Sequence, residues 1–491
     1  MDETRGMPEL AELMRAVDPI AIDGDAGVRV RALAADSRCV EPGSVFFAVA
    51  GEEDDGARYL SEAVARGAAA VVVAPGVAPP PGVSVVWVKD VRRAKALAAA
   101  SFHGEPSRTL PVVGVTGTNG KTTTAWMLRS IAEYDGGPTA MFGTVHHEIA
   151  GRRIPARNTT PDPIDLQREL AEGVRRGARL GIMEVSSHAL VQERVTGIDF
   201  RAAVFTNLAP EHLDFHGSIE AYRDAKARLF ESLDPSAVAI VNADDPMAAD
   251  LVRRTPARVV EFGLGGDVDV TADVRRVDRD GLAFDLITPY GDVDVTCRLP
   301  GHHNLENAIA AATAAVELGY PLDSIRGGFL LLKGVPGRLE PIECGQDFRV
   351  LIDYAHTDHA LEHVLRNLRP LTRGRIVTVF GCGGDRDRSK RPRMGRVATE
   401  RSDLTIVTSD NPRTEEPSAI IEEILGGTSP GAEVVVEPDR RAAIERALRA
   451  ARGGDIVLIA GKGHERVQLA GDEAREFDDR DVAREVLWSL S

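Results

Sequence analysis

A glycine-rich turn followed by a lysine and a threonine is the clearest chemical pattern in the chain. In VVGVTGTNGKTTT, three glycines precede Lys121 and Thr122. Small residues let backbone N–H groups wrap a phosphate, and a helix opening at Lys121 would present its positive end. Lys121 would reach the outer phosphates of a nucleoside triphosphate, and the Thr122 hydroxyl would hold Mg²⁺. The pattern predicts a nucleotide site at Gly117, Thr118, Asn119, Gly120, Lys121, Thr122 and Thr123.

The match to the strict GxxxxGK[ST] pattern is incomplete. Val115 stands where that pattern has its first glycine. A glycine-rich turn with a solvated lysine is therefore the alternative interpretation. The strand-like run before the turn and the helical pattern after it favour the nucleotide site. The loop alone does not separate a ligase from a switch or a motor.

A carboxylate, a histidine and a second lysine form the next candidate group. Glu184 ends a strand-like run in MEVSSHAL, His212 lies in EHLDFHG, and Lys226 lies on a predicted helix in AKARLF. Singly, each has an ordinary explanation as a surface or loop residue. When ATP activates a carboxylate, two anions must approach each other, and divalent cations lower their repulsion. We therefore interpret Lys121, Glu184, His212 and Lys226 as a catalytic set, with a metal held by Thr122, Glu184, His212 and Lys226.

The elements around these residues predict three α/β domains. A chain of 491 residues suggests about three domains. Strand and helix patterns alternate through 1–108, and a βαβ series with a parallel sheet follows in 109–337. After GVPGRLE, a second βαβ unit fills 338–491. A strand-rich insertion from about Val259 to Cys297 is interpreted as a small antiparallel excursion.

Composition narrows the class of protein. The formal net charge is -16, which argues against general nucleic-acid binding, because such binding relies on a basic surface. Hydrophobic residues make up 43%, and no run approaches the ~18 apolar residues of a membrane span. MDETRGMPEL lacks the layout of a signal peptide, so we expect a cytoplasmic protein. The four cysteines show no CxxC spacing, so neither a zinc site nor a disulfide framework is indicated.

Several further motifs follow in a fixed order along the chain. They include NTTPDP, TNLAPEHLDFHG, PGRLE, DYAHT, GCGGDRDRSKRP, DNPRTEEP and GKGHE. With the glycine-rich loop, this set resembles the Mur ligase family from Asp36 to Glu465. The resemblance implies an N-terminal UDP-binding domain, a central ATPase domain with a P-loop and a C-terminal Rossmann-like domain. It also implies ligation through an acyl phosphate in peptidoglycan precursor synthesis.

The resemblance implies further site residues. Lys226 would be carbamylated, which turns a cation into an anionic metal ligand. ATP would also contact Asn304, Arg338 and Asp353. The UDP-N-acetylmuramoyl-L-Ala-D-Glu substrate would be held by Ser37, Asn158, Thr159, Thr160, Ser186, Gln192 and Arg194.

The DNPR motif points, by resemblance, to meso-diaminopimelate as the amino acid that is added. The Arg413 guanidinium would pair with the distal carboxylate that lysine lacks. The substrate set here is Arg386, Asp410, Asn411, Pro412, Arg413, Gly461 and Glu465. The same reaction with L-lysine or L-ornithine is an alternative, as is a non-catalytic nucleotide-binding regulator of the same fold. We expect a monomer.

The chain departs from the family pattern in three places. DYAHT is followed by Asp358 and His359 where a proline is usual, His303 stands where an aromatic is common, and Glu211 replaces Asp. None of these positions is assigned to the chemistry. His303 would alter how the adenine packs.

Overall fold

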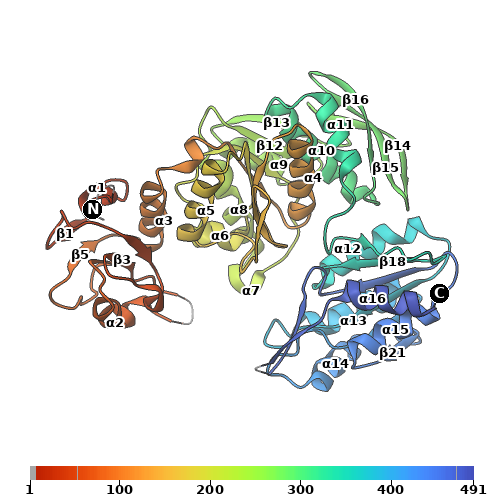
Figure 1. The fold of residues 1–491 in the computed structure, drawn as a ribbon. Helices are drawn as coiled ribbons and strands as arrows, with labels where there is room; N and C mark the ends of the chain where they lie inside the picture. Colours follow the sequence, from red (N-terminus) through yellow and green to blue (C-terminus); the bar gives the residue numbers. More distant parts are fainter. Residues whose placement is uncertain (1–6, 52–53, 472, 491) are drawn as a thin grey trace.

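The computed structural model describes residues 7–51, 54–471 and 473–490. The first six residues of the acidic N-terminal segment lie outside the described part. Three α/β regions follow one another, and the N-terminal region stands at one end of the molecule (Figure 1). Within the described ranges, no helix is both long and apolar enough to cross a membrane.

A five-stranded sheet forms the N-terminal region. Alternating buried valines and phenylalanines such as Val45 and Phe47 build its core. All pairings are parallel except that of β1 with β5. In sheet order the strands are β1 (Ala21–Asp23), β5 (Ser84–Trp87), β4 (Ala70–Val73), β3 (Ser44–Phe47) and β2 (Ala32–Ala34). The helices are α1 (Leu10–Met14), α2 (Leu60–Ala65) and α3 (Val91–Phe102).

The central region contains the predicted parallel sheet. Six of its strands pair in parallel, and two more, β8 and β9, extend the edge antiparallel. Runs without polar residues, such as VVGV, suit strands buried on both faces. The strands in sheet order are β13 (Arg258–Phe262), β12 (Val238–Asn242), β11 (Phe200–Phe205), β6 (Val112–Thr116), β10 (Leu180–Glu184), β7 (Thr139–Phe142), β8 (His147–Ile149) and β9 (Arg152–Ile154).

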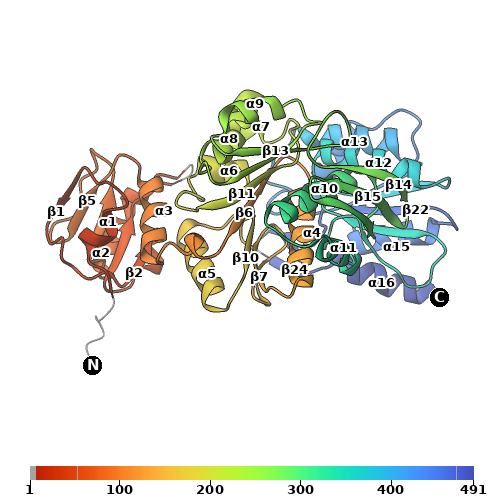
Figure 2. The same cartoon turned by 90° about the horizontal axis from the view of Figure 1, so that it is seen from above.

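Helices cover both faces of this sheet (Figure 2). Separate apolar clusters fill the two faces: one includes Leu128 and Ile309, the other Leu166 and Phe230. The helices are α4 (Lys121–Tyr134), α5 (Pro163–Arg175), α6 (Ser187–Val191), α7 (Leu213–His216), α8 (Ile219–Glu231), α9 (Ala248–Arg254), α10 (His302–Glu317) and α11 (Leu322–Leu331).

The antiparallel excursion is shorter than predicted. Only β14 (Thr271–Asp278), β15 (Gly281–Thr288) and β16 (Gly291–Cys297) form the separate antiparallel sheet. The first part of the predicted insertion, β13, instead pairs in parallel with β12. The reason is that α9 provides a short crossover between them, which returns the chain to the same sheet edge.

The C-terminal region repeats the open α/β design. Its sheet runs β17 (Glu340–Pro341), β18 (Arg349–Asp353), β22 (Ile456–Ala460), β19 (Ile376–Phe380), β20 (Leu404–Val407) and β21 (Val434–Val436). A hairpin of β23 (Val467–Ala470) and β24 (Glu473–Glu476) follows. The helices are α12 (Asp358–Leu368), α13 (Lys390–Arg401), α14 (Pro417–Leu425), α15 (Arg440–Ala450) and α16 (Asp479–Leu490).

Specific side chains join the three regions. Helix α3 packs on α5, where the buried Lys95 ammonium pairs with Asp162. On the other side, Arg349 of β18 pairs with Asp280 at the β14–β15 turn. Ligands of open α/β sheets bind beyond the carboxyl ends of the strands. The functional residues described next follow such strand ends.

Candidate active site

The glycine-rich loop connects β6 to α4 and is fixed to the end of β11. The Thr118 N–H donates to the Asn207 carbonyl at 2.8 Å, and the Asn119 N–H donates to Asn207 Oδ1 at 3.0 Å. Gly120 has a φ of 87°, and a Cβ there would meet Asn307 Oδ1 at 2.2 Å. Only glycine fits this turn. The loop therefore has the backbone shape that a phosphate site needs.

Lys121 lies at the first position of α4. Its Nζ donates to the carbonyls of Gly117 and Thr118, both at 2.8 Å. Burial lowers the pKa of Lys121, and the carboxylates of Glu211 and Glu184 oppose that shift. Lys121 therefore contacts the same loop that would bind the phosphates of a nucleotide.

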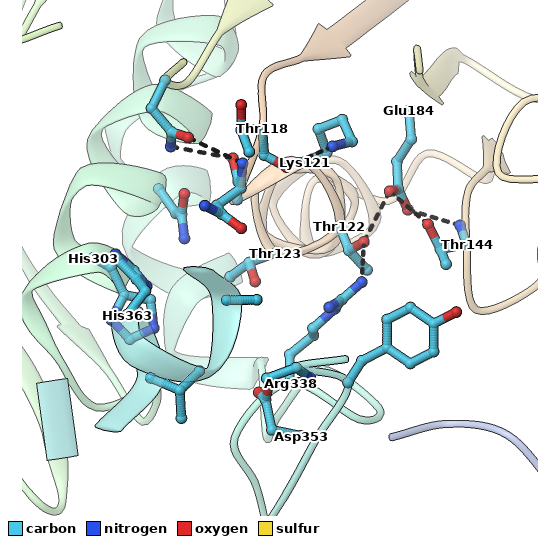
Figure 3. Close-up of a pocket in the computed structure, with 18 of the residues that line it drawn as sticks. Thr118, Lys121, Thr122, Thr123, Thr144, Glu184, His303, Arg338, Asp353 and His363 are labelled. Atoms are coloured by element: carbon cyan, nitrogen blue, oxygen red, sulfur yellow. Dashed lines mark hydrogen bonds between the residues drawn. The ribbon is translucent and has the colours of Figure 1, made fainter. Parts of the chain in front are cut away.

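Glu184 ends β10, as predicted, and is almost fully buried. Figure 3 shows its carboxylate between two threonines. The Thr122 hydroxyl donates to Oε2 at 2.8 Å, while the Thr144 N–H donates to Oε1 at 2.9 Å and its hydroxyl to Oε2 at 3.0 Å. A buried carboxylate with this many donors is held rigidly in one orientation.

Arg338 brings the C-terminal region to the nucleotide loop. Its Nη2 donates to Thr122 Oγ1 at 3.3 Å, and its guanidinium lies 5.0 Å from the centre of the Tyr354 ring. Asp353 accepts from the N–H groups of Leu339 and Ala355, both at 2.8 Å. Burial raises the pKa of Asp353, against the influence of Arg338. Asp353 thus fixes the turn from which Arg338 projects.

The same turn contacts the GKGHE motif. A Cβ at Gly337 would lie 2.4 Å from the His464 nitrogen, so the backbones approach as closely as glycine allows. The rings of His464 and Tyr354 are 4.9 Å apart. Burial lowers the pKa of His464 to about 3, which keeps the imidazole neutral.

A cavity with a volume of ≈ 320 Å³ runs from the loop to the start of α10. His303 and His363 form one wall, with ring centres 5.1 Å apart (Figure 3). Asn304 is fixed by a bond from its Nδ2 to the Pro300 carbonyl at 2.8 Å. Glu306 also lines the cavity, and burial together with Asp244 and Asp245 raises its pKa to about 7.

Lys226 lies on α8 beneath the loop. It is 1% exposed, its Nζ donates to the Gly117 carbonyl at 2.8 Å, and it lies 4.5 Å from the centre of the Tyr222 ring. Burial and the nearby Lys121 charge lower its pKa well below the usual range. The amine is therefore neutral at a pH where an ordinary lysine is charged.

The four predicted metal ligands are not all in contact. Thr122 bonds Glu184, whereas the His212 side chain is partly exposed just before α7, with its Nε2 3.8 Å from Glu211 Oε2. Partial burial lowers the pKa of His212. The nearby charges of Lys121 and Lys226 lower it further, while Glu211 opposes the shift. Among the described residues, no three His, Cys, Asp or Glu side chains could together hold a metal. The oxygen donors of Thr122 and Glu184 nevertheless suit Mg²⁺, which uses few protein ligands.

The residues predicted for the UDP-linked substrate fall into two places. Thr160 is buried and donates to the Glu184 carbonyl at 2.8 Å, and it accepts from the Ser186 N–H at 3.1 Å. Arg194 donates to the Thr160 carbonyl at 3.0 Å and to Gln192 Oε1 at 2.6 Å. The loop around Thr160 is therefore built onto the end of β10.

The remaining members of that set lie in different surroundings, and Thr159 lies beside the group around Glu184. Thr159 Oγ1 is 3.1 Å from Thr144 Oγ1, and Asn158 is exposed. Ser37 belongs to the N-terminal region, where its hydroxyl donates to Glu62 Oε2 at 2.9 Å. The structure therefore places Ser37 with a local partner in the N-terminal region, away from the group around Glu184.

The DNPR and GKGHE motifs meet after β20 and β22. Asn411 Nδ2 donates to Glu465 Oε2 at 2.8 Å. Arg413 Nη1 donates to the Gly384 carbonyl at 2.7 Å, with a φ of 52° at Arg413. A Cβ at Gly461 would lie 2.7 Å from Asp410 Oδ2. Asp410, Asn411, Arg413, Gly461 and Glu465 therefore lie together around the turn at Pro412.

Arg386 lies beside that group but makes no hydrogen bond to it among the described residues. Its side chain is exposed, and Nη1 donates to the Asp385 carbonyl at 3.1 Å. Asp385 in turn accepts from the Thr414 hydroxyl at 2.7 Å, so this loop is tied to the chain just after Arg413.

Several functional residues were missed in the sequence. Lys462 is fully buried between Asn411 and Glu465, and Thr144 and Asn207 hold Glu184 and the loop. Lys462 stood inside GKGHE, so a buried lysine beside an acid was a usable signal. Thr144 and Asn207 gave none, because their importance arises only from tertiary contacts.

Three family models match the chain in order. They are "Mur ligase family, catalytic domain" over 29–103, "Mur ligase middle domain" over 115–315, and "Mur ligase, glutamate ligase domain" over 337–463. A relative from Geobacter metallireducens, named UDP-N-acetylmuramoyl-L-alanyl-D-glutamate--2,6-diaminopimelate ligase, is 45% identical over 98% of this chain and 99% of the relative.

Solved structures agree with these matches. A structure of UDP-N-acetylmuramoyl-L-alanyl-D-glutamate--2,6-diaminopimelate ligase has a TM-score of 0.69 and 33% identity, covering 99% of both chains. The MurF ligase from Thermotoga maritima in complex with ADP has a TM-score of 0.61 at 19% identity, covering 94% of this chain and 97% of that one, and shares the fold. The motifs, the three α/β regions and these matches agree over nearly the whole length, and the chain belongs to the Mur ligase family.

Proposed function

We propose that this protein joins meso-diaminopimelate to UDP-N-acetylmuramoyl-L-Ala-D-Glu at the expense of ATP, in peptidoglycan precursor synthesis. One observation carries the proposal. The Thr122 hydroxyl of the phosphate loop bonds Glu184 and is reached by Arg338 from the next region. A site that gathers an anion-binding loop, a fixed carboxylate and an arginine suits transfer of a phosphoryl group.

The reaction has two steps in which atoms balance. The D-glutamate side-chain carboxylate attacks the γ-phosphorus, and ADP leaves with the electrons of the broken P–O bond. The free amine then attacks the acyl phosphate carbon, inorganic phosphate leaves, and the amine loses its proton. Lys121 and Arg338 would stabilise the charge that develops on the transferring phosphoryl group.

A divalent cation fits the donors at this site. Thr122 and Glu184 would hold Mg²⁺. The bound ion would reduce the repulsion between the triphosphate and the substrate carboxylate. We also propose that CO₂ adds to the Lys226 amine with loss of a proton. The depressed pKa of Lys226 supports this, because only the neutral amine is a nucleophile. His212 would act on the same side of the site as the Lys226 carbamate.

The remaining binding roles are proposed for residues of the cavity and of the loops around it. Nucleotide contacts are proposed for Asn304, Arg338 and Asp353, which line the cavity. The Thr160 loop and Arg194 would hold the peptide end of the UDP-linked substrate, with Ser37 on its nucleotide end. We propose domain boundaries of 1–108, 109–337 and 338–491. Because ATP is an intracellular reactant, the reaction belongs in the cytoplasm.

The acceptor is proposed from the charges of the DNPR site. Diaminopimelate carries two ammonium and two carboxylate groups. Arg413 keeps donors free for a carboxylate, since its only hydrogen bond from the side chain to the described residues is the one to Gly384. Asp410 and Glu465 supply acceptors for ammonium groups.

The test is phosphate release from ATP with UDP-N-acetylmuramoyl-L-Ala-D-Glu and each of meso-diaminopimelate, L-lysine and L-ornithine. We expect strong stimulation by diaminopimelate alone, with Lys121→Ala as the inactive control. Preference for lysine or ornithine would overturn the acceptor and keep the ligase. No release with any acceptor would favour a non-catalytic regulator.

A further inference from the structure

Lys462 is a buried cation that the proposed mechanism does not use. The side chain is 0% exposed and lies just after β22, in the GKGHE motif. A buried ammonium is costly unless several acceptors surround it. Its Nζ has three: Asn411 Oδ1 at 3.1 Å, Glu465 Oε2 at 3.3 Å and the Val467 carbonyl at 2.5 Å.

These contacts fix the direction in which Asn411 and Glu465 face. Asn411 Oδ1 accepts from Lys462 and from the Leu469 N–H at 3.1 Å, so its Nδ2 must point the other way. That Nδ2 donates to Glu465 Oε2 at 2.8 Å. Glu465 Oε2 therefore has two donors. Among the described residues none donates to Glu465 Oε1, which leaves that oxygen for a ligand ammonium.

Lys462 also sets the charge of the site. Asp410 and Glu465 are negative, and Lys462 and Arg413 are positive, so the four side chains sum to zero. The neighbouring Arg440 is fully buried and neutralised by Asp479, with Arg440 Nη2 and Asp479 Oδ2 2.7 Å apart. Arg386 is exposed, so solvent and salt screen its charge.

A neutral site matches a neutral ligand. meso-Diaminopimelate has two ammonium and two carboxylate groups and a net charge of zero, whereas L-lysine has a net charge of +1. Electrostatic complementarity contributes more to specificity than to raw affinity. Removing Lys462 would leave the pocket with a net charge of −1, which favours the cationic amino acid.

We propose that Lys462 is a specificity-determining positioning residue: it orients Asn411 and Glu465 and balances their charge so that a net-neutral diamino acid is preferred over a cationic one. The inference rests on the proposed function, because it concerns the acceptor of that reaction. The inference predicts a change in acceptor preference, which a simple loss of stability does not produce.

The experiment compares kcat/KM for meso-diaminopimelate and L-lysine in the full-length protein and in Lys462→Met. The ratio of the two values is expected to fall by about tenfold or more, while the KM for ATP stays within about twofold. Lys95→Met is the matched control, because Lys95 is also a buried, acid-paired lysine but lies between α3 and α5. Its ratio should equal that of the wild type.

A second variant keeps the test decisive if Lys462→Met does not fold. Glu465→Gln retains Lys462 and removes a partly buried negative charge, so the ratio should rise instead of fall. An unchanged ratio in folded Lys462→Met, or a fall in Glu465→Gln, would overturn the inference alone. If the wild type does not use diaminopimelate at all, the proposed function fails and the inference fails with it.

Discussion

The phosphate loop after β6 and the proposed amino-acid site after β20 and β22 lie at the same kind of place, the carboxyl ends of parallel strands. They are built from different groups. The loop presents backbone N–H groups on glycines such as Gly120, whose φ is positive. The proposed amino-acid site presents polar and charged side chains that bond one another, as Asn411 and Glu465 do.

This difference separates general chemistry from specificity. A backbone loop binds any phosphate of the right size, since its donors are the same in every protein. Charged side chains select by the sum and the placement of their charges. Substitutions near the loop should therefore affect every acceptor alike, and substitutions near DNPR should affect acceptors unequally.

The largest effect is expected at Lys226, beneath the loop. Lys226→Ala should reduce turnover by more than about 100-fold, because it removes the amine that would carry the carbamate. Binding of the UDP-linked substrate, followed by calorimetry, should be nearly unchanged. The exposed Lys89 provides a control, and Lys89→Ala should behave as the wild type. Unchanged turnover in Lys226→Ala would remove this residue from the catalytic set.

A smaller and selective effect is expected at Arg413. Arg413→Ala should lower kcat/KM for meso-diaminopimelate by about 10- to 100-fold, because a carboxylate loses a charged donor. The KM for ATP should not move. Arg386→Ala, at an exposed position, is the matched comparison and should lower kcat/KM for meso-diaminopimelate by a smaller factor. Equal losses for the amino acid and for ATP would make Arg413 structural and would erase the contrast between the two sites.

The smallest effect concerns pH at the nucleotide cavity. Burial and the neighbouring Asp244 and Asp245 raise the pKa of Glu306 to about 7. The carboxyl is neutral below that pH and becomes an anion above it, which opposes binding of the anionic nucleotide. The KM for ATP should therefore rise by about threefold from pH 6 to pH 8.5 in the wild type. Glu306→Gln should flatten this rise, and an identical profile in both proteins would contradict the assignment.

The sequence was sufficient for features whose information is local. The strand before the loop, the helix opening at Lys121 and the strand ending at Glu184 were all predicted, because hydrophobic runs and glycine spacing act over a few residues. The prediction that placed β13 in the antiparallel excursion was wrong, because its pairing with β12 depends on a crossover that hydrophobic periodicity does not record.

Contacts between distant segments could not be predicted from spacing. Arg338 and Thr122 are 216 positions apart, and only the packing of the C-terminal region against the central region brings them together. Thr144 offered no signal, since one threonine among many has no distinguishing neighbour in sequence. The roles of both depend on tertiary packing, which was not available from the residues alone.

The turn around Gly337 has a consequence for building chimaeras. Gly337 lies against the backbone of His464, and Asp353 holds the next residues of the turn through the Leu339 N–H. A graft that exchanges one C-terminal region for another must therefore carry this turn with the donor region. A cut made after the turn would leave Gly337 facing a foreign loop, and the seam would fall within the nucleotide cleft.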